Sequence, residues 1–390
     1  MVEYCEFARQ ENTVRRFFSS TAKYLRETDL LLLALCVISS VYGLVLIRSV
    51  TLNSSGSEVT VQTAALILGV ILYVLVSLFD IDILANKPKT LIIISLLFIA
   101  TLYPWGVTIN GNKAWLRFAG IGIQPAEIVK IPFTIIIASY ISSFKSRRTL
   151  DSPLSVMKLV LIFGMFFALI IIISSDLGSA LVYFFILAVV MFVSGLKLRW
   201  FLVGAAAIGA IAPIAWYRFL SEDQIKRILA PFDPTIDPTG LGVTWQPTLS
   251  KLAISSGGFK GQGLFHGSMT QTGRVSQQSS DFIFSAAGEE LGFVGCFLIV
   301  ALLMLIIIRC IYVGVKSNST LGLLVCTGIA SMFIFQTFEN IGMCLGLTPV
   351  IGLTLPFFSY GGSSIVTNFI AMGIIAGIKI RPKPLSFRHN

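Results

Sequence analysis

The 390-residue sequence has few charged residues. Asp, Glu, Lys and Arg together make up 12% of it, whereas hydrophobic residues make up 55%. A soluble fold of this length cannot bury so much apolar surface, so water-soluble enzymes and binding proteins are excluded. The sequence also has only two histidines, and none of its six cysteines forms a CxxC pair, which argues against metal sites built on these residues and against a disulfide framework. The chain is expected to be an integral membrane protein.

Apolar runs of about the length that crosses a bilayer as a helix recur along the chain. Ten of them lie near residues 30–47, 59–79, 90–105, 125–143, 156–173, 180–194, 200–217, 282–308, 320–345 and 360–378. They predict an all-α polytopic membrane protein with ten transmembrane helices and one long extracellular loop, residues 218–280, between the seventh and eighth helices. The first run has no small-residue cleavage site after it, so it is expected to be an uncleaved span and not a signal peptide.

The distribution of positive charge predicts the orientation. The net charge of +10 does not require a nucleic-acid partner, because outside the long loop most Lys and Arg residues fall on the side of the N-terminus. This positive-inside bias places both termini in the cytoplasm. The predicted organisation is a cytoplasmic tail over residues 1–29, a transmembrane domain over 30–380 and a second cytoplasmic tail over 381–390.

One stretch combines apolar sequence with three acids. Residues 276–295 change from a polar loop into an apolar helix, with Asp281 at the water side. In a continuous helix Glu289 and Glu290 would lie roughly 12–14 Å deeper than Asp281. Carboxylates at that depth are costly in lipid, so they are expected to face the bundle interior or a wet cavity and to mark function. The alternative is that Asp281 is a solvated residue whose charge suits a helix N-terminus.

A second charged stretch precedes the predicted fourth helix. Its outer loop contains Lys113, Trp115 and Arg117, and the helix that follows carries Glu127 and Lys130. The last two are three residues apart on one helical face, so they can neutralise each other inside the bundle. The alternative is a purely structural ion pair, which is weak evidence of activity.

Three further stretches have simpler interpretations. Asp176, in a tight turn before the sixth helix, is expected to cap that helix. The glycine-rich run over 255–268 is not a P-loop, because no strand precedes it and no GKS or GKT follows. The uncharged, proline-broken loop over 345–361 is expected to fold back into the bundle near the outer cavity, since irregular backbone at membrane depth must be covered.

Taken in order, these stretches resemble the SEDS family (shape, elongation, division and sporulation) of polytopic bacterial peptidoglycan polymerases. The motifs are N-G…W…Q-P-x-E-x-x-K, D-L-G-S-A, D-P-x-x-D-P-x-G, S-G-G-x-x-G-x-G, D-F-I-F-x-x-x-G-E-E-L-G and the run from N-I-G-M to S-Y-G-G-S-S. Each motif is weak alone, and their joint order is specific. The chain departs from the family pattern over 276–280, where Pro-Glu-x-His-Thr is common, and at Ser175, where a proline usually precedes D-L-G.

The resemblance implies a ten-helix bundle in the bacterial cytoplasmic membrane. Its implied activity is polymerisation of lipid II into glycan strands at the outer leaflet, for elongation, division or sporulation, with a class B penicillin-binding protein as the crosslinking partner. Asp281 matches the family's essential Asp, and Trp115, Glu127 and Lys130 match functionally important residues. The partner's helix is expected on the eighth and ninth helices and on the loop around Phe357, Phe358 and Tyr360. The alternative is that this loop only packs inward.

This activity requires a base and positive charge. Asp281 is the candidate base, because partial desolvation raises the pKa of a carboxyl. The leaving pyrophosphate requires cations, and a divalent ion, Mg²⁺ or Mn²⁺, is one candidate. The protein's own candidates are Lys130, if its pair with Glu127 is loose, and the outer-loop residues Lys113, Arg117, Lys251, Lys260 and Arg274.

Two other functions use the same features. A lipid II flippase would use a charged cavity that opens to both faces, and a scaffold of a cell-wall complex would use surfaces alone. The charged residues gather toward the outer half of the spans, which favours chemistry at the outer face.

Overall fold

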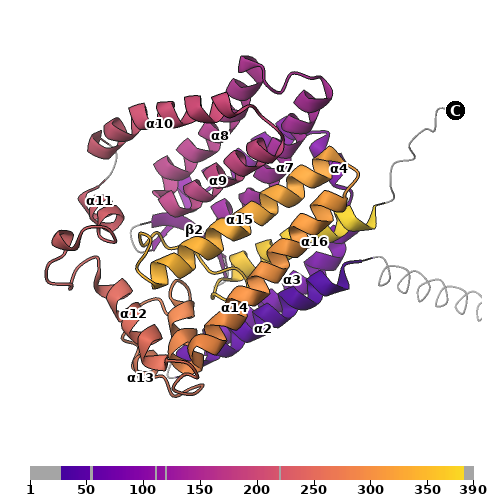
Figure 1. Cartoon of the computed structure of the whole chain (residues 1–390). Helices are drawn as coiled ribbons and strands as arrows, with labels where there is room; N and C mark the ends of the chain where they lie inside the picture. Colours follow the sequence, from indigo (N-terminus) through magenta and orange to yellow (C-terminus); the bar gives the residue numbers. More distant parts are fainter. Residues whose placement is uncertain (1–27, 53–55, 110–111, 119–120, 219–220, 382–390) are drawn as a thin grey trace, which may run out of the picture.

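The computed structural model describes residues 28–52, 56–109, 112–118, 121–218 and 221–381. The predicted N-terminal and C-terminal tails therefore lie outside the described residues, apart from Thr28, Asp29 and Arg381. The described chain is a bundle of long helices that run roughly side by side, with short helices and loops gathered at one end (Figure 1). Asp281 lies at this end, which we call the site end.

Nine helices in the described part of the chain are long and apolar enough to cross a membrane. They are α2 (Leu30–Val50), α3 (Ser57–Ser77), the pair α5 (Pro88–Ala100) and α6 (Leu102–Trp105), α7 (Pro125–Ser146), α8 (Pro153–Ser174), α10 (Leu198–Arg218), α14 (Ile283–Lys316), α15 (Thr320–Cys344) and α16 (Gly362–Ile380). The apolar α9 (Leu177–Val193) has 17 residues and falls short of that length. The all-α polytopic class is confirmed, and a tenth span stays a prediction that depends on α9.

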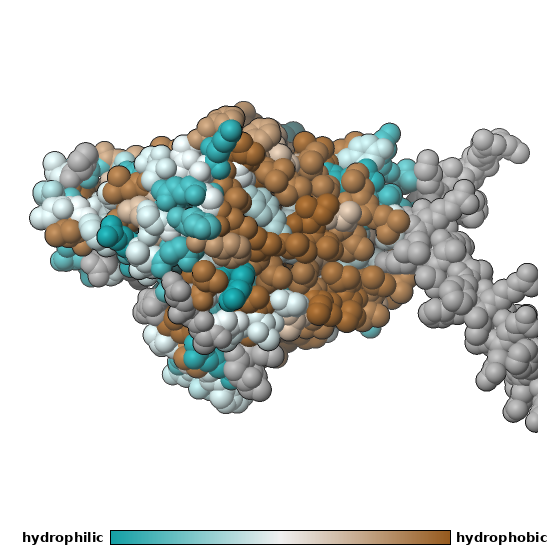
Figure 2. Space-filling view, turned by 90° about the horizontal axis from the view of Figure 1, so that it is seen from below, coloured by the Kyte–Doolittle hydropathy of each residue, from teal (hydrophilic) through white to brown (hydrophobic). Residues whose placement is uncertain are grey.

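The surface is that of a membrane protein. Figure 2 shows a wide hydrophobic belt with hydrophilic residues toward both ends of the molecule. Large apolar side chains such as Ile172, Leu202 and Val315 are mostly exposed on it. Exposed apolar patches of this extent in a helical bundle are the surface that lipid tails contact.

α16 lies at the centre of the bundle, and most of its side chains are buried. It packs against α3, where a Cβ placed on Gly373 would lie 2.7 Å from the carbonyl oxygen of Tyr73. Glycine at this position therefore allows the two backbones to touch, as small residues do between membrane helices. At the end of the bundle opposite Asp281, Asp29 accepts a hydrogen bond from Arg309 Nε at 2.8 Å and lies 3.6 Å from Lys379 Nζ, which joins α2, α14 and α16.

The predicted outer loop before α7 is a small antiparallel sheet. Its strands are β1 (Val107–Ile109), β2 (Asn112–Phe118) and β3 (Ile121–Ile123), in the order β1-β2-β3. Val107 pairs with Trp115, and Arg117 pairs with Gly122. The apolar runs and motifs did not predict this sheet.

The long segment over 218–280 also contains helices. They are α11 (Glu222–Leu229), the 3₁₀ helix η1 (Pro234–Ile236), α12 (Trp245–Gly257) and the single turn α13 (Ser268–Gln271). α12 packs against the start of α14, whereas α10, which precedes the segment, lies along the edge of the molecule with its apolar side chains exposed (Figure 1). From α12 onward, the segment thus forms a folded cap on the site end.

α14 is not a continuous helix, because the chain reverses at Gly292. This residue has φ 65° and ψ −158°, and Cys296 Sγ lies 3.9 Å from the carbonyl oxygen of Phe284. Twelve residues of continuous helix would separate these positions by about 18 Å. The backbone groups that the reversal leaves without a helical partner bind the glycine-rich loop. Gln262 N donates to Glu289 O at 2.9 Å, and Phe293 N donates to Gly258 O at 2.9 Å.

The reversal corrects the expected depth of the two glutamates. Glu290 Oε1 accepts a hydrogen bond from the hydroxyl of Ser49, in the last turn of α2 at the site end, at 2.7 Å. Glu289 accepts from the backbone N–H groups of Met269 and Thr270 at 2.7 and 2.8 Å. Both carboxylates are buried, as expected, but they hold the α13 turn at the site end and do not lie two helical turns below Asp281.

Candidate active site

Asp281 lies in a tight turn two residues before α14. Its backbone N–H donates to Gln277 O at 3.0 Å, and its carbonyl accepts from Asn340 Nδ2 at 2.8 Å. The N-terminus of α14 has no side-chain cap, so helix capping does not explain this residue. Burial raises the pKa of Asp281 to about 6, the charge of Asp176 adds to the rise, and a hydrogen bond with Ser280 opposes it.

The proline-broken loop over 345–361 forms a wall of the site, as predicted. Tyr360 N donates to Ser279 O at 2.7 Å, and the Ser359 hydroxyl donates to Ser280 O. Asn340 Nδ2, which also contacts Asp281, donates to Leu353 O at 2.7 Å. The loop and the Asp281 turn are therefore bound to each other directly, through Ser359 and Tyr360, and through the side chain of Asn340.

The inward packing of this loop corrects one expectation about the partner. Phe357 and Phe358 are 1% and 0% exposed, and Phe357 stacks on Phe333 of α15 with ring centroids 5.5 Å apart. The expectation that these two rings offer surface to a partner helix is wrong. They fill the core because the loop folds back into the bundle.

A second group of charges lies at the start of α7 and α9. Asp176 caps α9 as predicted, accepting from Ser179 N at 2.9 Å, and its other oxygen accepts from Gln124 Nε2 at 2.9 Å. Glu127 and Lys130 form the predicted ion pair, and both are buried. Because the pair is close and Lys130 has no exposed surface, its charge is not free for a leaving group.

The two groups form one charged cluster, which we define as Asp281, Asp176, Glu127 and Lys130. Burial raises the pKa of Asp176, hydrogen bonds from Ser179 oppose the rise, and Lys130 and Glu127 act on it in opposite directions. The loop lies between Asp281 and α9: a Cβ on Gly352 would be 3.6 Å from Asp281 Oδ2, and one on Gly178 would meet Ile351 O. Lys130 is paired with Glu127 and acts on Asp176, and Asp281 is linked to them through the charge of Asp176, so this is a place where protons can be accepted.

The sheet brings Trp115 and Arg117 beside the cluster. The ring of Trp115 lies over Gly122, whose carbonyl accepts from the hydroxyl of Ser363 at the start of α16 at 2.8 Å. Arg117 is exposed, and its positive charge partly offsets the rise that burial causes in the pKa of Tyr360. Lys113 points elsewhere, since its ammonium donates to Tyr103 O at 2.7 Å.

The remaining candidate cations do not join the cluster. Lys251, Lys260 and Arg274 are exposed on the cap and form no side-chain ion pair or hydrogen bond with a described residue. The described residues also contain no group of three or more His, Cys, Asp or Glu that could hold a metal ion.

Polar residues buried within the spans were not among the predicted site residues. Asn340 ties Asp281 to the loop, and its Oδ1 has no hydrogen-bond partner among the described residues. The same holds for buried atoms of Gln336 and Glu339 on α15 and of Thr367 and Asn368 on α16. Polar residues inside an apolar span are themselves a functional signal, which could have identified them.

Comparison with known proteins shows the relatives of this chain. Residues 26–383 match the FtsW/RodA/SpoVE model, described as cell cycle protein. The chain is 30% identical over 360 residues to the peptidoglycan glycosyltransferase MrdB of Escherichia coli K12, covering 92% of this chain and 94% of MrdB. It is 36% identical over 293 residues to the probable peptidoglycan glycosyltransferase FtsW of Borreliella burgdorferi, covering 75% and 77%.

Solved structures show the same fold. A chain of a peptidoglycan synthase complex that coordinates polymerization and crosslinking superposes with a TM-score of 0.76 at 29% identity, covering 90% of this chain and 97% of that chain. The rod shape determining protein RodA of Thermus thermophilus superposes with a TM-score of 0.66 at 27% identity, covering 90% and 96%.

Proposed function

Because the chain belongs to the FtsW/RodA/SpoVE family of cell cycle proteins, the SEDS family, we propose that it is a peptidoglycan glycosyltransferase that polymerises lipid II. The observation that supports this most directly is the Asp281 carboxylate, which is held in a rigid turn beside a second buried aspartate. The relatives that carry this activity in their names cover nearly the whole chain, so the proposal concerns the entire domain.

The proposed step is a single displacement. The hydroxyl of the acceptor sugar attacks the anomeric carbon of the donor, the new C–O bond forms as the bond to the pyrophosphate breaks, and the proton passes to the Asp281 carboxylate. A base with a pKa near 6 is ionised at neutral pH and still accepts a proton well. No covalent enzyme intermediate is required, since the displacement inverts the sugar carbon once.

The proposed substrate-binding residues differ in how they can act. Trp115 offers an aromatic face beside the cluster, and the charge of exposed Arg117 acts on Tyr360 in the loop wall. Lys130 and Glu127 neutralise each other's charge in the interior, so they act on the site indirectly and do not bind the leaving group. Lys113, Lys260 and Arg274 are proposed only for the outer path of the pyrophosphate or the glycan strand.

We keep a divalent cation, Mg²⁺ or Mn²⁺, as a proposed companion of the substrate's pyrophosphate. The described carboxylates do not form a set of three ligands, so such an ion would be held largely by phosphate oxygens, with Asp281 or Asp176 as the nearest protein oxygens. It would neutralise charge on the leaving group. The proton transfer to Asp281 stands without it.

The chain is a multi-pass membrane protein, and we propose that both termini are cytoplasmic and that the site end faces outward. A class B penicillin-binding protein is the proposed partner, because a structure that matches this chain comes from a complex that coordinates polymerization and crosslinking. Exposed apolar side chains on α14 and α15, including Phe297, Met304 and Phe338, offer surface for a partner helix.

Purified protein mixed with lipid II tests the proposal. Wild-type protein should form glycan polymer, and the Asp281→Asn protein should not. Movement of lipid II across liposomes without polymer would favour a flippase, and the absence of both activities, alone and with the transpeptidase present, would favour a scaffold.

A further inference from the structure

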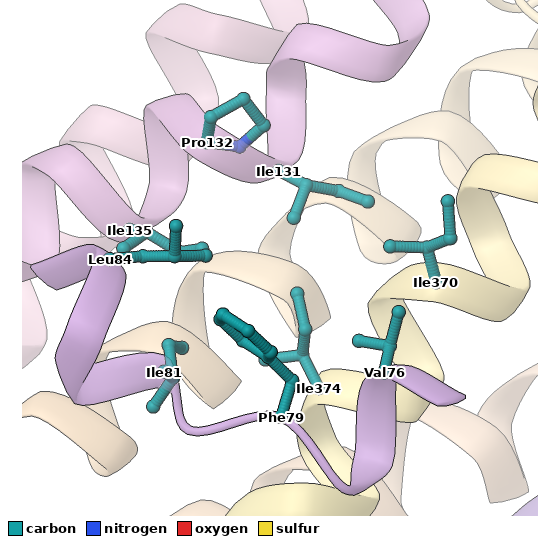
Figure 3. Close-up of a pocket in the computed structure, with 9 residues that line it drawn as sticks. All are labelled: Val76, Phe79, Ile81, Leu84, Ile131, Pro132, Ile135, Ile370 and Ile374. Atoms are coloured by element: carbon teal, nitrogen blue, oxygen red, sulfur yellow. The ribbon is translucent and has the colours of Figure 1, made fainter. Parts of the chain in front are cut away.

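An apolar cavity of 180 Å³ lies between α3, α7, α16 and the short helix α4 (Ile81–Ala85) (Figure 3). All nine side chains that line it are apolar, and they include Ile131 and Ile135 of α7 and Ile374 of α16. An enclosed apolar cavity of about 150 Å³ is large enough to hold benzene. This cavity can therefore take several carbons of a hydrocarbon chain.

Most of the cavity lies away from the charged cluster, which it approaches at Ile131, the residue after Lys130. Ile374 is twelve residues into α16, about 18 Å from the helix start near Asp281. Val76 is one residue before the end of α3, about 28 Å from the start of that helix. The cavity thus extends from the middle of the hydrophobic belt to the end opposite the site.

The short helix α4, which forms one wall of the cavity, is held by contacts with α7 and with the end of α16. α4 is tied to α7, because the hydroxyl of Ser139 donates to Ala85 O at 2.6 Å. It is tied to the end of α16, because Arg381 contacts Asp80 at 2.8 Å and Asp82 at 3.5 Å. Asp80 and Asp82, at the start of α4, are therefore paired with Arg381 beside the cavity.

Two cations follow α4 in the chain. Lys87 N donates to Leu84 O at 3.1 Å, and Leu84 lines the cavity, so Lys87 lies within one turn of it. Lys87 and Lys89 are exposed and form no ion pair with a described residue. An apolar cavity with free cations at its rim is complementary to a lipid whose head is negative and whose tail is hydrocarbon.

We infer that this cavity holds an acyl chain of an anionic phospholipid from the leaflet opposite the active site, with its headgroup at Lys87 and Lys89. The lipid would pack against α7 at Ile131, the residue next to Lys130, so it would stabilise the helix that carries the buried ion pair. This inference concerns the opposite end of the bundle and does not rest on the proposed reaction.

Native mass spectrometry of the full chain in detergent tests it, with phosphatidylglycerol and phosphatidylcholine of the same acyl chains as probes. Wild-type protein should retain a phosphatidylglycerol molecule that the cavity-filling variant Ile131→Phe/Ile374→Phe does not. The matched control Ile93→Phe/Ile94→Phe, on the exposed face of α5, should retain it.

The headgroup is tested separately with Lys87→Gln/Lys89→Gln, which alters only exposed side chains and should fold normally. Its preference for phosphatidylglycerol over phosphatidylcholine should fall roughly fivefold for each lysine removed. Equal lipid retention by the cavity-filling variant and wild type would overturn the inference. Displacement of phosphatidylglycerol by undecaprenyl phosphate at equal concentration would also overturn it, by assigning the cavity to an isoprenoid tail.

Discussion

Asp281 has no helix to cap and no cation in direct contact, so its carboxylate is available to accept a proton. Asp281→Asn keeps its size but cannot act as a base, and polymerisation should fall on the order of 10²–10⁴-fold. Protein level and thermal stability should hold or rise at neutral pH, since a buried ionised group is removed. Glycan polymer from lipid II is the measurement, and Glu222→Gln in α11, whose side chain is exposed, is the control. A near wild-type rate would remove Asp281 from the role of base.

The pKa of Asp281 predicts a pH profile. Burial raises this pKa to about 6, so the carboxylate is ionised above pH 6 and protonated below it. Polymerisation at saturating lipid II should therefore be level above about pH 7 and fall about tenfold per pH unit well below 6. The Asp281→Asn protein should lose this dependence in its residual rate. An unchanged acidic limb in the variant would assign the titration to another group.

The buried ion pair predicts a different result for Glu127. Glu127→Gln leaves the Lys130 ammonium unpaired in the bundle interior, which typically costs about 3–5 kcal/mol. The variant should show reduced protein level and thermal stability as well as reduced activity. Glu127→Gln/Lys130→Met removes both charges and should recover most of the stability. If the single variant is as stable as wild type, the pair does not hold the interior together.

At the scale of elements, the reversal at Gly292 predicts a strict need for glycine. Its φ and ψ are those that glycine alone adopts readily, and a Cβ there would lie 2.3 Å from Gly261 N. Gly292→Ala should therefore cost more than about 2 kcal/mol and lower the amount of folded protein. Gly209→Ala is the control, because a Cβ there meets nothing within 4 Å. Size-exclusion profiles after heating should separate the two.

The elements that could be predicted are those whose signal is local. The long helices follow from apolar runs, and the Glu127–Lys130 pair follows from i, i+3 spacing. The reversal at Gly292 could not be predicted, because it depends on hydrogen bonds with a loop some thirty residues earlier. The small sheet could not be predicted either, because strands this short show no clear alternation of apolar and polar residues.

In the candidate site, too, local features could be predicted and contacts between distant segments could not. Asp281, Trp115 and the ion pair were identified from charge in apolar surroundings and from family motifs. That Asp176 lies near Asp281 was not predicted. Its role as the N-cap of α9 already explained Asp176, and the loop that lies between the two aspartates comes from residues 350–353. The sequence left open whether Phe357 and Phe358 face a partner or pack inward, because it does not show which side of a loop faces the core.

At the scale of the whole molecule, the proposed orientation predicts opposite accessibility for the two ends. Ser276 is exposed on the site end, and Asn318 is exposed between α14 and α15 at the other end. In a Cys5→Ser background, Ser276→Cys should react with an impermeant maleimide in intact cells and Asn318→Cys only after lysis. The described native cysteines are buried and should stay silent. The reverse pattern would invert the topology.

The turn that carries Asp281 is held by parts of the chain that are made after it. It is contacted by Asn340, Ser359 and Tyr360, and Ser359 is in turn bound by Gln62 from α3. A ribosome that has translated Asp281 has therefore not yet produced a working site. Catalytic competence arrives only when the last segments have entered the membrane, so a truncated translation product carries the aspartate without its environment and should be inert toward cell-wall precursors.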